Sequence, residues 1–241
     1  MDPNLFYIAE GNPALRFASE YLAKQGCRIA DAPGKSVTHL LLPVPCPAGS
    51  DLWRELASQL SEDVTVLGGN LAELIPSGYK KADLLKDEIY LAENAAITAD
   101  CAVRLAGAHL KTTFRNCPIL VLGWGRIGKC LARMLAALGA DVTVAARKES
   151  DRAMAQALDY GSTCFDGDLS RYRIIFNTAP APVFTETQLP DCIKIDLASK
   201  KGMEGDDVIW ARGLPGKMLP ESSGRLIGKT VLRLVGKEAV L

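Results

Sequence analysis

Three glycines in the middle of the chain have the spacing of a dinucleotide-binding loop. Gly123, Gly125 and Gly128 directly follow a charge-free apolar run at 119–122, and an amphipathic helical pattern follows them. In such a loop the first glycine allows a tight turn, the second lets the backbone approach a pyrophosphate, and the third lets helix and strand pack closely. The N-terminus of the helix then offers N–H groups to the phosphates. The spacing predicts a dinucleotide site, and the alternative is a glycine turn without a ligand.

The residues expected beside the adenosine ribose favour a phosphorylated cofactor. A second strand predicted at 142–146 ends in Ala146, where enzymes that use NAD usually carry Asp or Glu for the ribose 2′-hydroxyl. Arg147, Lys148 and Ser150 follow, and their cations and hydroxyl would hold a 2′-phosphate. We therefore predict NADP in preference to NAD. The alternatives are that the cations are solvated turn residues, or that Arg147 stacks on adenine.

Two later loops follow predicted strands, at the edge of the sheet where ligands bind. Residues 177–182 follow a strand at 174–176, and residues 196–202 follow a strand at 193–195. Small and amide-bearing side chains there could approach the nicotinamide, although such residues are also ordinary in turns. The complete set of predicted cofactor contacts is Gly123, Gly125, Arg126, Ile127, Gly128, Ala146, Arg147, Lys148, Ser150, Asn177, Thr178, Ala179, Pro180, Asp196, Ala198 and Ser199.

The elements that position these loops alternate between strand and helix along the chain. The first half is predicted to contain strands at 5–9, 27–30, 37–42 and 64–67, with helices at 14–24 and 51–60. A helix of small apolar residues is expected at 93–110, before the glycine loop. Such alternation predicts βαβ units and parallel sheets. The expected fold class is α/β, with two Rossmann-like domains that each contain a doubly wound parallel sheet.

Composition and charge exclude several classes of protein. Lys plus Arg and Asp plus Glu both number 28, so the general basic field of a nucleic-acid binder is not expected. No apolar run reaches the roughly 18 to 20 residues of a membrane helix, and the first residues lack the positive segment of a secretory signal. Seven widely spaced cysteines and two histidines fit neither a disulfide framework nor a multi-histidine metal site. We expect a cytoplasmic protein with reduced thiols and without a metal, nucleic-acid or membrane partner.

An ordered set of short motifs resembles the family of dipicolinate synthase A-type subunits. The motifs are Gly-Trp-Gly-Arg-Ile-Gly-Lys at 123–129, Asn-Thr-Ala-Pro-Ala at 177–181, Asp-Leu-Ala-Ser at 196–199, Gly-Leu-Pro-Gly-Lys at 213–217 and Pro-Glu-Ser-Ser-Gly at 220–224. The resemblance is strong from about residue 92 to 235 and thinner before that. It implies an architecture like that of formate and glycerate dehydrogenases, with the active site in a cleft between two domains.

The resemblance also implies a reaction and its partners. The expected reaction is NADP-dependent dehydration and oxidation of 4-hydroxytetrahydrodipicolinate to dipicolinate (pyridine-2,6-dicarboxylate) during sporulation, in the mother cell of a spore-forming bacterium. A second, flavoprotein-like dipicolinate synthase subunit of the B type and a homo-oligomeric state are expected. Positive groups must then hold the dicarboxylate, and the candidates are Lys200, Lys201, Ser222, Ser223 and Arg225, the serines as part of a helix N-terminus. Plain helix caps and solvated lysines are the alternatives.

The predicted domain organisation has four parts. Residues 1–92 form an α/β domain on the substrate side, and residues 93–114 form a linking helix. Residues 115–220 form the NADP-binding Rossmann domain, and residues 221–241 form a helix that packs back towards the cleft.

Other functions stay open because no acid–base residue stands out. A D-2-hydroxyacid dehydrogenase would need a late histidine as general base, and neither His39 nor His109 lies beyond position 109. We interpret His109 as a buried or hydrogen-bonded structural residue. A non-catalytic NADP-binding or nucleotide-sensing protein fits the missing acid–base group. A shikimate-dehydrogenase-like enzyme would need a Lys–Asp pair in the N-terminal domain, which the sequence does not identify.

Overall fold

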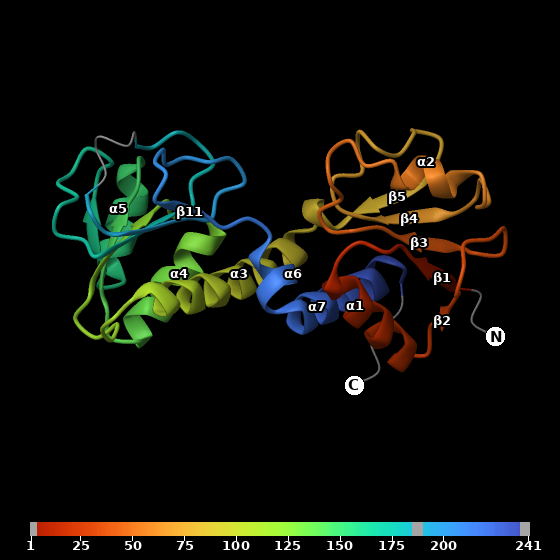
Figure 1. The fold of residues 1–241 in the computed structure, drawn as a ribbon, viewed down its shortest axis with the longest axis horizontal. Coiled ribbons are helices and arrows are strands. Elements are labelled where there is room, and N and C mark those ends of the chain that lie inside the picture. The colour runs from red at the N-terminus through yellow and green to blue at the C-terminus, as the bar shows by residue number, and fades with distance from the viewer. Residues whose placement is uncertain (1–3, 185–189, 237–241) are drawn as a thin grey trace. The chain divides into compact units, whose positions relative to one another are not determined.

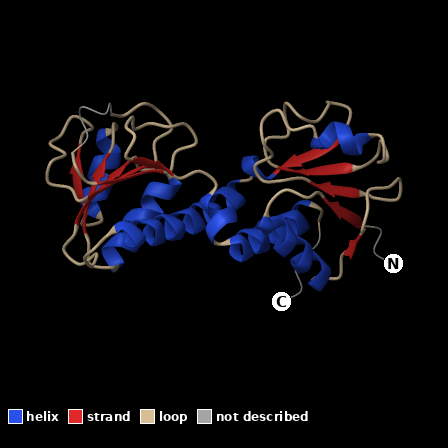
Figure 2. Ribbon diagram, in the orientation of Figure 1, coloured by secondary structure: helices blue, strands red, loops and turns tan. Residues whose placement is uncertain are grey.

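The chain forms two compact units, each built around one parallel sheet (Figure 1). The computed structural model describes residues 4–184 and 190–236. Unit 1 combines the two ends of the chain, residues 1–94 and 215–241, and unit 2 contains residues 95–214. Helices flank both sheets (Figure 2). The predicted fold class, α/β with two Rossmann-like domains, is confirmed.

The sheet of unit 1 has the strand order β2-β1-β3-β4-β5, one of the two common doubly wound orders. Its strands are β1 (Leu5–Ile8), β2 (Arg28–Ile29), β3 (His39–Leu41), β4 (Thr65–Gly68) and β5 (Lys80–Asp83). The helices are α1 (Pro13–Lys24), α2 (Leu52–Ala57), the 3-10 helix η1 (Leu84–Lys86) and α7 (Pro220–Leu234). Apolar side chains from β3, β4 and α2 are buried together and form the core of this unit.

Helix α7 returns the end of the chain to unit 1 and packs on α1. The two backbones approach so closely that a Cβ atom on Gly224 would lie 2.3 Å from the Ala14 carbonyl oxygen. Two charged contacts, Arg233 with Asp87 and Lys229 with Glu93, join α7 to the segment that begins α3. Of the C-terminal helix predicted at 221–241, residues 237–241 lie outside the described residues.

The sheet of unit 2 has the order β11-β10-β9-β6-β7-β8. Its strands are β6 (Pro118–Leu122), β7 (Asp141–Ala145), β8 (Gly161–Thr163), β9 (Ile174–Asn177), β10 (Ile193–Asp196) and β11 (Val208–Trp210). Its helices are α4 (Arg126–Ala137) and α5 (Glu149–Ala157), while α3 (Glu88–His109) and α6 (Leu214–Met218) cross the unit boundaries. From β6 the chain continues to one side through β7 and β8, and then to the other side through β9, so the order reverses between β6 and β9. This is the strand order of dinucleotide-binding folds.

The predicted elements are largely present, with shifted ends and several omissions. The long helix begins at Glu88 and not at residue 93, because the Asp87 side chain accepts a hydrogen bond from the Tyr90 N–H at 2.7 Å and caps the helix start. Strands β5, β8 and β11 and helix α5 were not predicted, since they are short or polar. Within the described residues, no helix is long and apolar enough to cross a membrane.

Candidate functional site

The glycine loop joins β6 to α4 in a conformation that requires glycine at two positions. Gly123 has a φ of +99°, and a Cβ atom there would lie 2.7 Å from Thr178 Oγ1. A Cβ atom on Gly128 would lie 2.2 Å from the Gly123 carbonyl oxygen. Both distances are shorter than any van der Waals contact, so helix, turn and strand can pack this closely only without side chains.

Gly125 differs from its two neighbours because the space beside it is open. It is the N-cap of α4, it supplies no side-chain cap, and a Cβ atom there would meet no heavy atom within 4 Å. The first N–H groups of a helix have no partner within the helix and carry a partial positive charge. The start of α4, with Arg126 exposed and Ile127 half-buried, therefore fits the pyrophosphate of a dinucleotide.

Thr178 connects the two strands at which the strand order reverses. Its N–H and its Oγ1 both donate to the Leu122 carbonyl oxygen, at 2.9 and 2.8 Å. The end of β9 is thereby held against the end of β6, beside the glycine turn. In open α/β sheets this reversal point is where ligands bind, so the predicted contacts Gly123 and Thr178 lie at the expected place.

Asn177 and Asp196 have different roles from those predicted. Both side chains are completely buried. Asp196 Oδ1 accepts from Asn177 Nδ2 and the Ala198 N–H, both at 3.0 Å, and Oδ2 accepts from the N–H groups of Gly202 and Met203. Because the chain itself uses these atoms, neither side chain is accessible to a cofactor. The prediction of direct contact is corrected, and both side chains position the loops after β9 and β10.

Those loops expose other predicted residues. Ala179 is half-buried, Pro180 and Ser199 are exposed, and Ala198 is buried. Trp210 Nε1 donates to the Ala198 carbonyl oxygen at 3.2 Å, which fixes the loop to β11. The surfaces that remain available for a ligand at this edge are therefore mainly those of Ala179, Pro180 and Ser199.

The end of β7 carries an exposed pair of cations. Ala146 is buried, whereas Arg147, Lys148 and Ser150 are exposed. Arg152 Nη1 donates to the carbonyl oxygens of Ala146 and Arg147, at 2.8 and 2.9 Å, and so holds this turn. Arg152 is not among the residues predicted from the sequence, because its role depends on helix α5, which was not predicted. No carboxylate occupies position 146, although α5 has acidic residues in its first turn.

The residues predicted to hold the substrate are divided between the two units. Lys200 and Lys201 are exposed in unit 2, whereas Ser222, Ser223 and Arg225 lie on α7 in unit 1.

The two serines lie in the first turn of α7 and not at its cap position. Pro220 begins the helix, as proline often does at a first helical position, so Ser222 is the third helical residue and Ser223 the fourth. Ser223 is buried, and its N–H donates to the Leu219 carbonyl oxygen at 3.0 Å. Arg225 forms an ion pair with Glu221 at 2.8 Å. The Ser223 N–H group and the Arg225 guanidinium therefore already have partners in the first turns of α7 or just before it.

Neither histidine is placed as a catalytic base of unit 2. His39 lies on β3 in unit 1, stacks on Phe6 and contacts the Thr38 hydroxyl, and burial lowers its pKa. His109 ends α3 before the amino end of β6 and is exposed, so of the two alternatives, a buried or a hydrogen-bonded structural residue, the buried one is wrong. In the described parts of the chain, no group of three His, Cys, Asp or Glu side chains could hold a metal ion.

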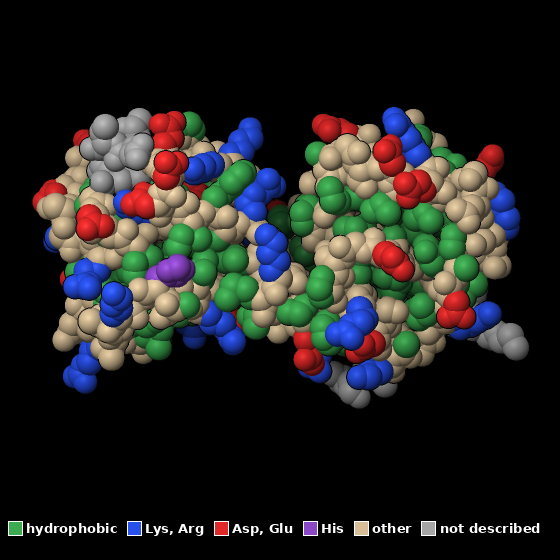
Figure 3. Space-filling model, viewed as in Figure 1, with side chains coloured by type: hydrophobic (Ala, Val, Ile, Leu, Met, Phe, Trp, Pro, Cys, Tyr) green, Lys and Arg blue, Asp and Glu red, His purple; other side chains and the backbone are tan. Residues whose placement is uncertain are grey.

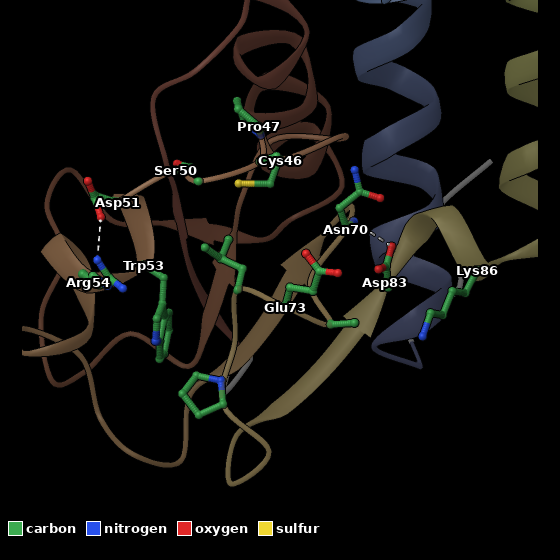
Figure 4. A pocket seen from close by; sticks show the side chains of 15 residues that line it. Cys46, Pro47, Ser50, Asp51, Trp53, Arg54, Asn70, Glu73, Asp83 and Lys86 are labelled. Carbon is green, nitrogen blue, oxygen red and sulfur yellow. Dashed lines mark hydrogen bonds and ion pairs between the residues drawn. The ribbon is translucent and has the colours of Figure 1, made fainter. Parts of the chain in front are cut away.

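Unit 1 contains a cavity that the sequence analysis did not identify. Its volume is about 740 Å³, and loops that follow β3, β4 and β5 line it (Figure 4). None of the predicted cofactor or substrate residues takes part. A second cavity of about 520 Å³ lies beside β1 and the start of α1. The only sequence signal for the first cavity is a Gly-Gly-Asn turn after a predicted strand, at 68–70.

Comparisons with known proteins agree with this geometry. Residues 96–189 match the model of the NAD-binding domain of D-isomer specific 2-hydroxyacid dehydrogenases. The chain is 27% identical to the A-type subunit of dipicolinate synthase from Bacillus subtilis, over 88% of this chain and 82% of that protein.

Solved structures show the same fold. The A-type subunit of dipicolinate synthase from Bacillus halodurans is 22% identical, with a TM-score of 0.83 over 98% of this chain and 99% of that one. A transhydrogenase from Sinorhizobium meliloti is 14% identical, with a TM-score of 0.70 over 97% and 92% of the two chains. The resemblance to the A-type subunits of dipicolinate synthase is thereby confirmed. The similarities support an oxidoreductase with a nicotinamide cofactor.

Proposed function

We propose that this protein is an NADP-dependent oxidoreductase that dehydrates and oxidises 4-hydroxytetrahydrodipicolinate to dipicolinate. The observation that carries the proposal is the similarity to the A-type subunit of dipicolinate synthase, which extends over 88% of the chain and is not limited to the glycine loop. The partner in this proposal is a flavoprotein-like B-type subunit, and the protein acts as a homo-oligomer in the cytoplasm of the mother cell during sporulation.

The cofactor in this proposal lies across the carboxyl edge of the sheet in unit 2. The Gly123 turn and the start of α4 hold its diphosphate. Arg147, Lys148 and Ser150 hold the 2′-phosphate, because cations and a hydroxyl stabilise a phosphate where a carboxylate would repel it. A bound nicotinamide supplies a hydride acceptor, and the exposed parts of the loops at 179–180 and 198–199 orient its ring.

The face of the molecule in Figure 3 carries basic and acidic side chains that are interspersed, without one basic field. Substrate capture in this proposal therefore depends on a few local groups. The overall reaction removes one water, one hydride and one proton from the substrate, and formation of the aromatic ring makes it favourable.

A turnover experiment tests the proposal. The hydroxytetrahydrodipicolinate is generated in situ, NADP is added with and without the flavoprotein-like partner, and NADPH and dipicolinate are followed together. We expect both products in equal amounts, and a lower rate with NAD. Absence of dipicolinate under both conditions would contradict the proposal.

A second candidate function is that of a non-catalytic, NADP-binding component of a complex. The observation that favours it is the use of the Asp196 carboxylate by four donors of its own chain, so that this carboxylate is not available as an acid or base. For this function, NADPH would bind with ordinary affinity while no dipicolinate forms with or without the flavoprotein-like partner.

A further inference from the structure

The cavity of about 740 Å³ in unit 1 lies where an open α/β sheet binds ligands. Its walls come from residues 46–54 after β3, 70–76 after β4 and 83–86 after β5. Three loops that are separate in the sequence thus meet beyond the carboxyl ends of three adjacent strands. The volume is in the range of pockets that enclose small molecules.

Several charged groups that line the cavity are already used by the protein. Asp83 Oδ1 accepts from the N–H groups of Asn70 and Leu85, at 3.3 and 2.9 Å, and Oδ2 accepts from the Leu71 N–H at 3.0 Å. Asp51 and Arg54 form an exposed ion pair at 3.2 Å. These groups therefore build the walls, and their charges are largely compensated.

Three other polar side chains are available to a ligand. Within residues 4–184 and 190–236, no hydrogen bond or ion pair holds the Glu73 carboxylate, the Lys86 ammonium or the Asn70 carboxamide. Asn70 has a φ of +61°, which is uncommon for a residue with a side chain and is often found at functional positions. In the view of Figure 4, Asn70 and Glu73 lie after β4, and Asp83 lies between them and Lys86.

The remaining wall is apolar or neutral. Trp53 is buried and packs edge-on against Tyr79, with ring centroids 4.7 Å apart. Burial raises the pKa of the Cys46 thiol, although a hydrogen bond with Ser50 opposes this shift, so the thiol is protonated at neutral pH. The cavity therefore combines an aromatic surface with one carboxylate, one ammonium group and one carboxamide that have no partner within the described residues.

We propose that this cavity binds the ring dicarboxylate, with Lys86 and Asn70 on a substrate carboxylate and Glu73 as the catalytic proton acceptor of the dehydration. Glu73 takes a proton from the ring carbon next to the one that carries the hydroxyl group. The electron pair of that C–H bond forms the new ring double bond, and the C–O bond breaks. Glu73 returns the proton to the departing hydroxide, so that water leaves and no oxidant is consumed. This inference rests on the proposed function.

Charge-removing variants with matched controls test the assignment. The variants are Glu73→Gln and Lys86→Met, and the controls are Glu62→Gln and Lys24→Met, which are exposed and lie outside the cavity. Calorimetry measures the Kd of pyridine-2,6-dicarboxylate without nucleotide. Turnover with NADP gives kcat and kcat/KM from pH 5 to 9.

The two variants should fail in different ways. Glu73→Gln lowers kcat by about 10²- to 10⁴-fold, changes the pH profile of kcat/KM and leaves the Kd of the diacid nearly unchanged. Lys86→Met weakens diacid binding by about tenfold, the scale of one hydrogen bond to a charged group, with little effect on the pH profile. A merely structural role for Glu73 would not change the pH profile.

A third variant, Asn70→Gly, distinguishes a loss of diacid binding from a loss of stability. Glycine adopts positive φ without strain, so this variant should melt no earlier than the wild type while binding the diacid more weakly. If the wild type forms dipicolinate and all three variants behave like the controls, the cavity assignment is wrong and the proposed function stands. If the wild type neither binds the diacid nor forms it, the proposed function fails and the inference fails with it.

Discussion

The loops at the carboxyl edges of the two sheets are built in different ways. In unit 2 the edge is made by one short turn, where Gly123 and Gly128 allow backbone contacts that no side chain would permit. In unit 1 the edge is made by three separate loops that leave a cavity of about 740 Å³ between them. The first edge would hold a ligand mainly with backbone N–H groups, and the second mainly with side chains.

This difference explains why the two edges are not equally visible in the sequence. A site made of backbone needs glycine at fixed spacing, which leaves a motif within six residues. A site made of side chains from distant loops needs no fixed spacing, because the sheet topology brings them together. The unit 2 edge should therefore respond most to changes of shape, and the unit 1 edge to changes of charge.

The largest expected effect comes from a methyl group in the unit 2 turn. Gly128→Ala should destabilise the protein by about 3 kcal/mol and abolish nucleotide binding, because the new Cβ would lie 2.2 Å from the Gly123 carbonyl oxygen. Urea unfolding and an NADPH titration measure the two effects.

The matched control for that change is Gly125→Ala, where the added atom enters open space. This variant should keep the wild-type stability within about 0.5 kcal/mol and still bind NADPH more weakly, because the pyrophosphate needs the same space. If both variants lost the same free energy of unfolding, the open space beside Gly125 would not distinguish it from Gly128 in the packing of the loop.

A smaller loss is expected from Asp196→Asn. One carboxylate oxygen becomes an NH₂ group that faces N–H donors in a completely buried position. The cost should be about 2–3 kcal/mol, the scale of hydrogen bonds to a charged group. Because Asp196 positions loops and is not accessible to a cofactor, the Kd of NADPH for the folded variant should differ from the wild-type Kd by less than about threefold. If the variant lost more free energy of NADPH binding than free energy of unfolding, Asp196 would contact the cofactor directly, as predicted from the sequence.

The fold and the nucleotide edge could be predicted because their signals are local. Charge-free strands such as 119–122 and the glycine spacing after them are visible within a short window. The polar strand β5 at Lys80–Asp83 has no such pattern, and its place in the sheet depends on pairing with β4. Without β5, the third wall of the unit 1 cavity could not be foreseen. Similarly, the burial of Asp196 depends on a turn that reaches Met203, which spacing alone does not indicate.

The proposed preference for NADP depends on the cations at the end of β7. Arg147→Ala should weaken NADPH binding by about 1.5–3 kcal/mol and leave NADH binding nearly unchanged, because only NADPH carries the 2′-phosphate. The control is Arg133→Ala, an exposed arginine on α4 outside the predicted site. Equal weakening of both nucleotides would indicate that Arg147 stacks on adenine, and equal wild-type affinities for both would contradict the NADP assignment.

The smallest expected effect is at the contact between Arg233 on α7 and Asp87 before α3, two residues that do not line the unit 1 cavity. The hydrogen bond from Arg233 lowers the pKa of Asp87 below its ordinary value, so this contact stabilises the folded protein above the ordinary pKa. The stabilisation is lost as the pH falls through the lowered pKa of the folded state. Arg233→Met should therefore lower the unfolding free energy at pH 7 by less than about 1 kcal/mol, since the arginine is 40% exposed and solvent screens the pair.

The effect of the same variant on the unfolding free energy should become smaller as the pH falls from 7 to 2.5, because the contact loses its stabilisation as the lowered pKa of Asp87 is approached. Urea unfolding at the two pH values measures this. The Kd of NADPH and that of pyridine-2,6-dicarboxylate should both stay at wild-type values, because Arg233 belongs to neither edge. An effect of Arg233→Met on either ligand, at unchanged stability, would show that the contact between α7 and α3 influences a binding edge as well as the fold.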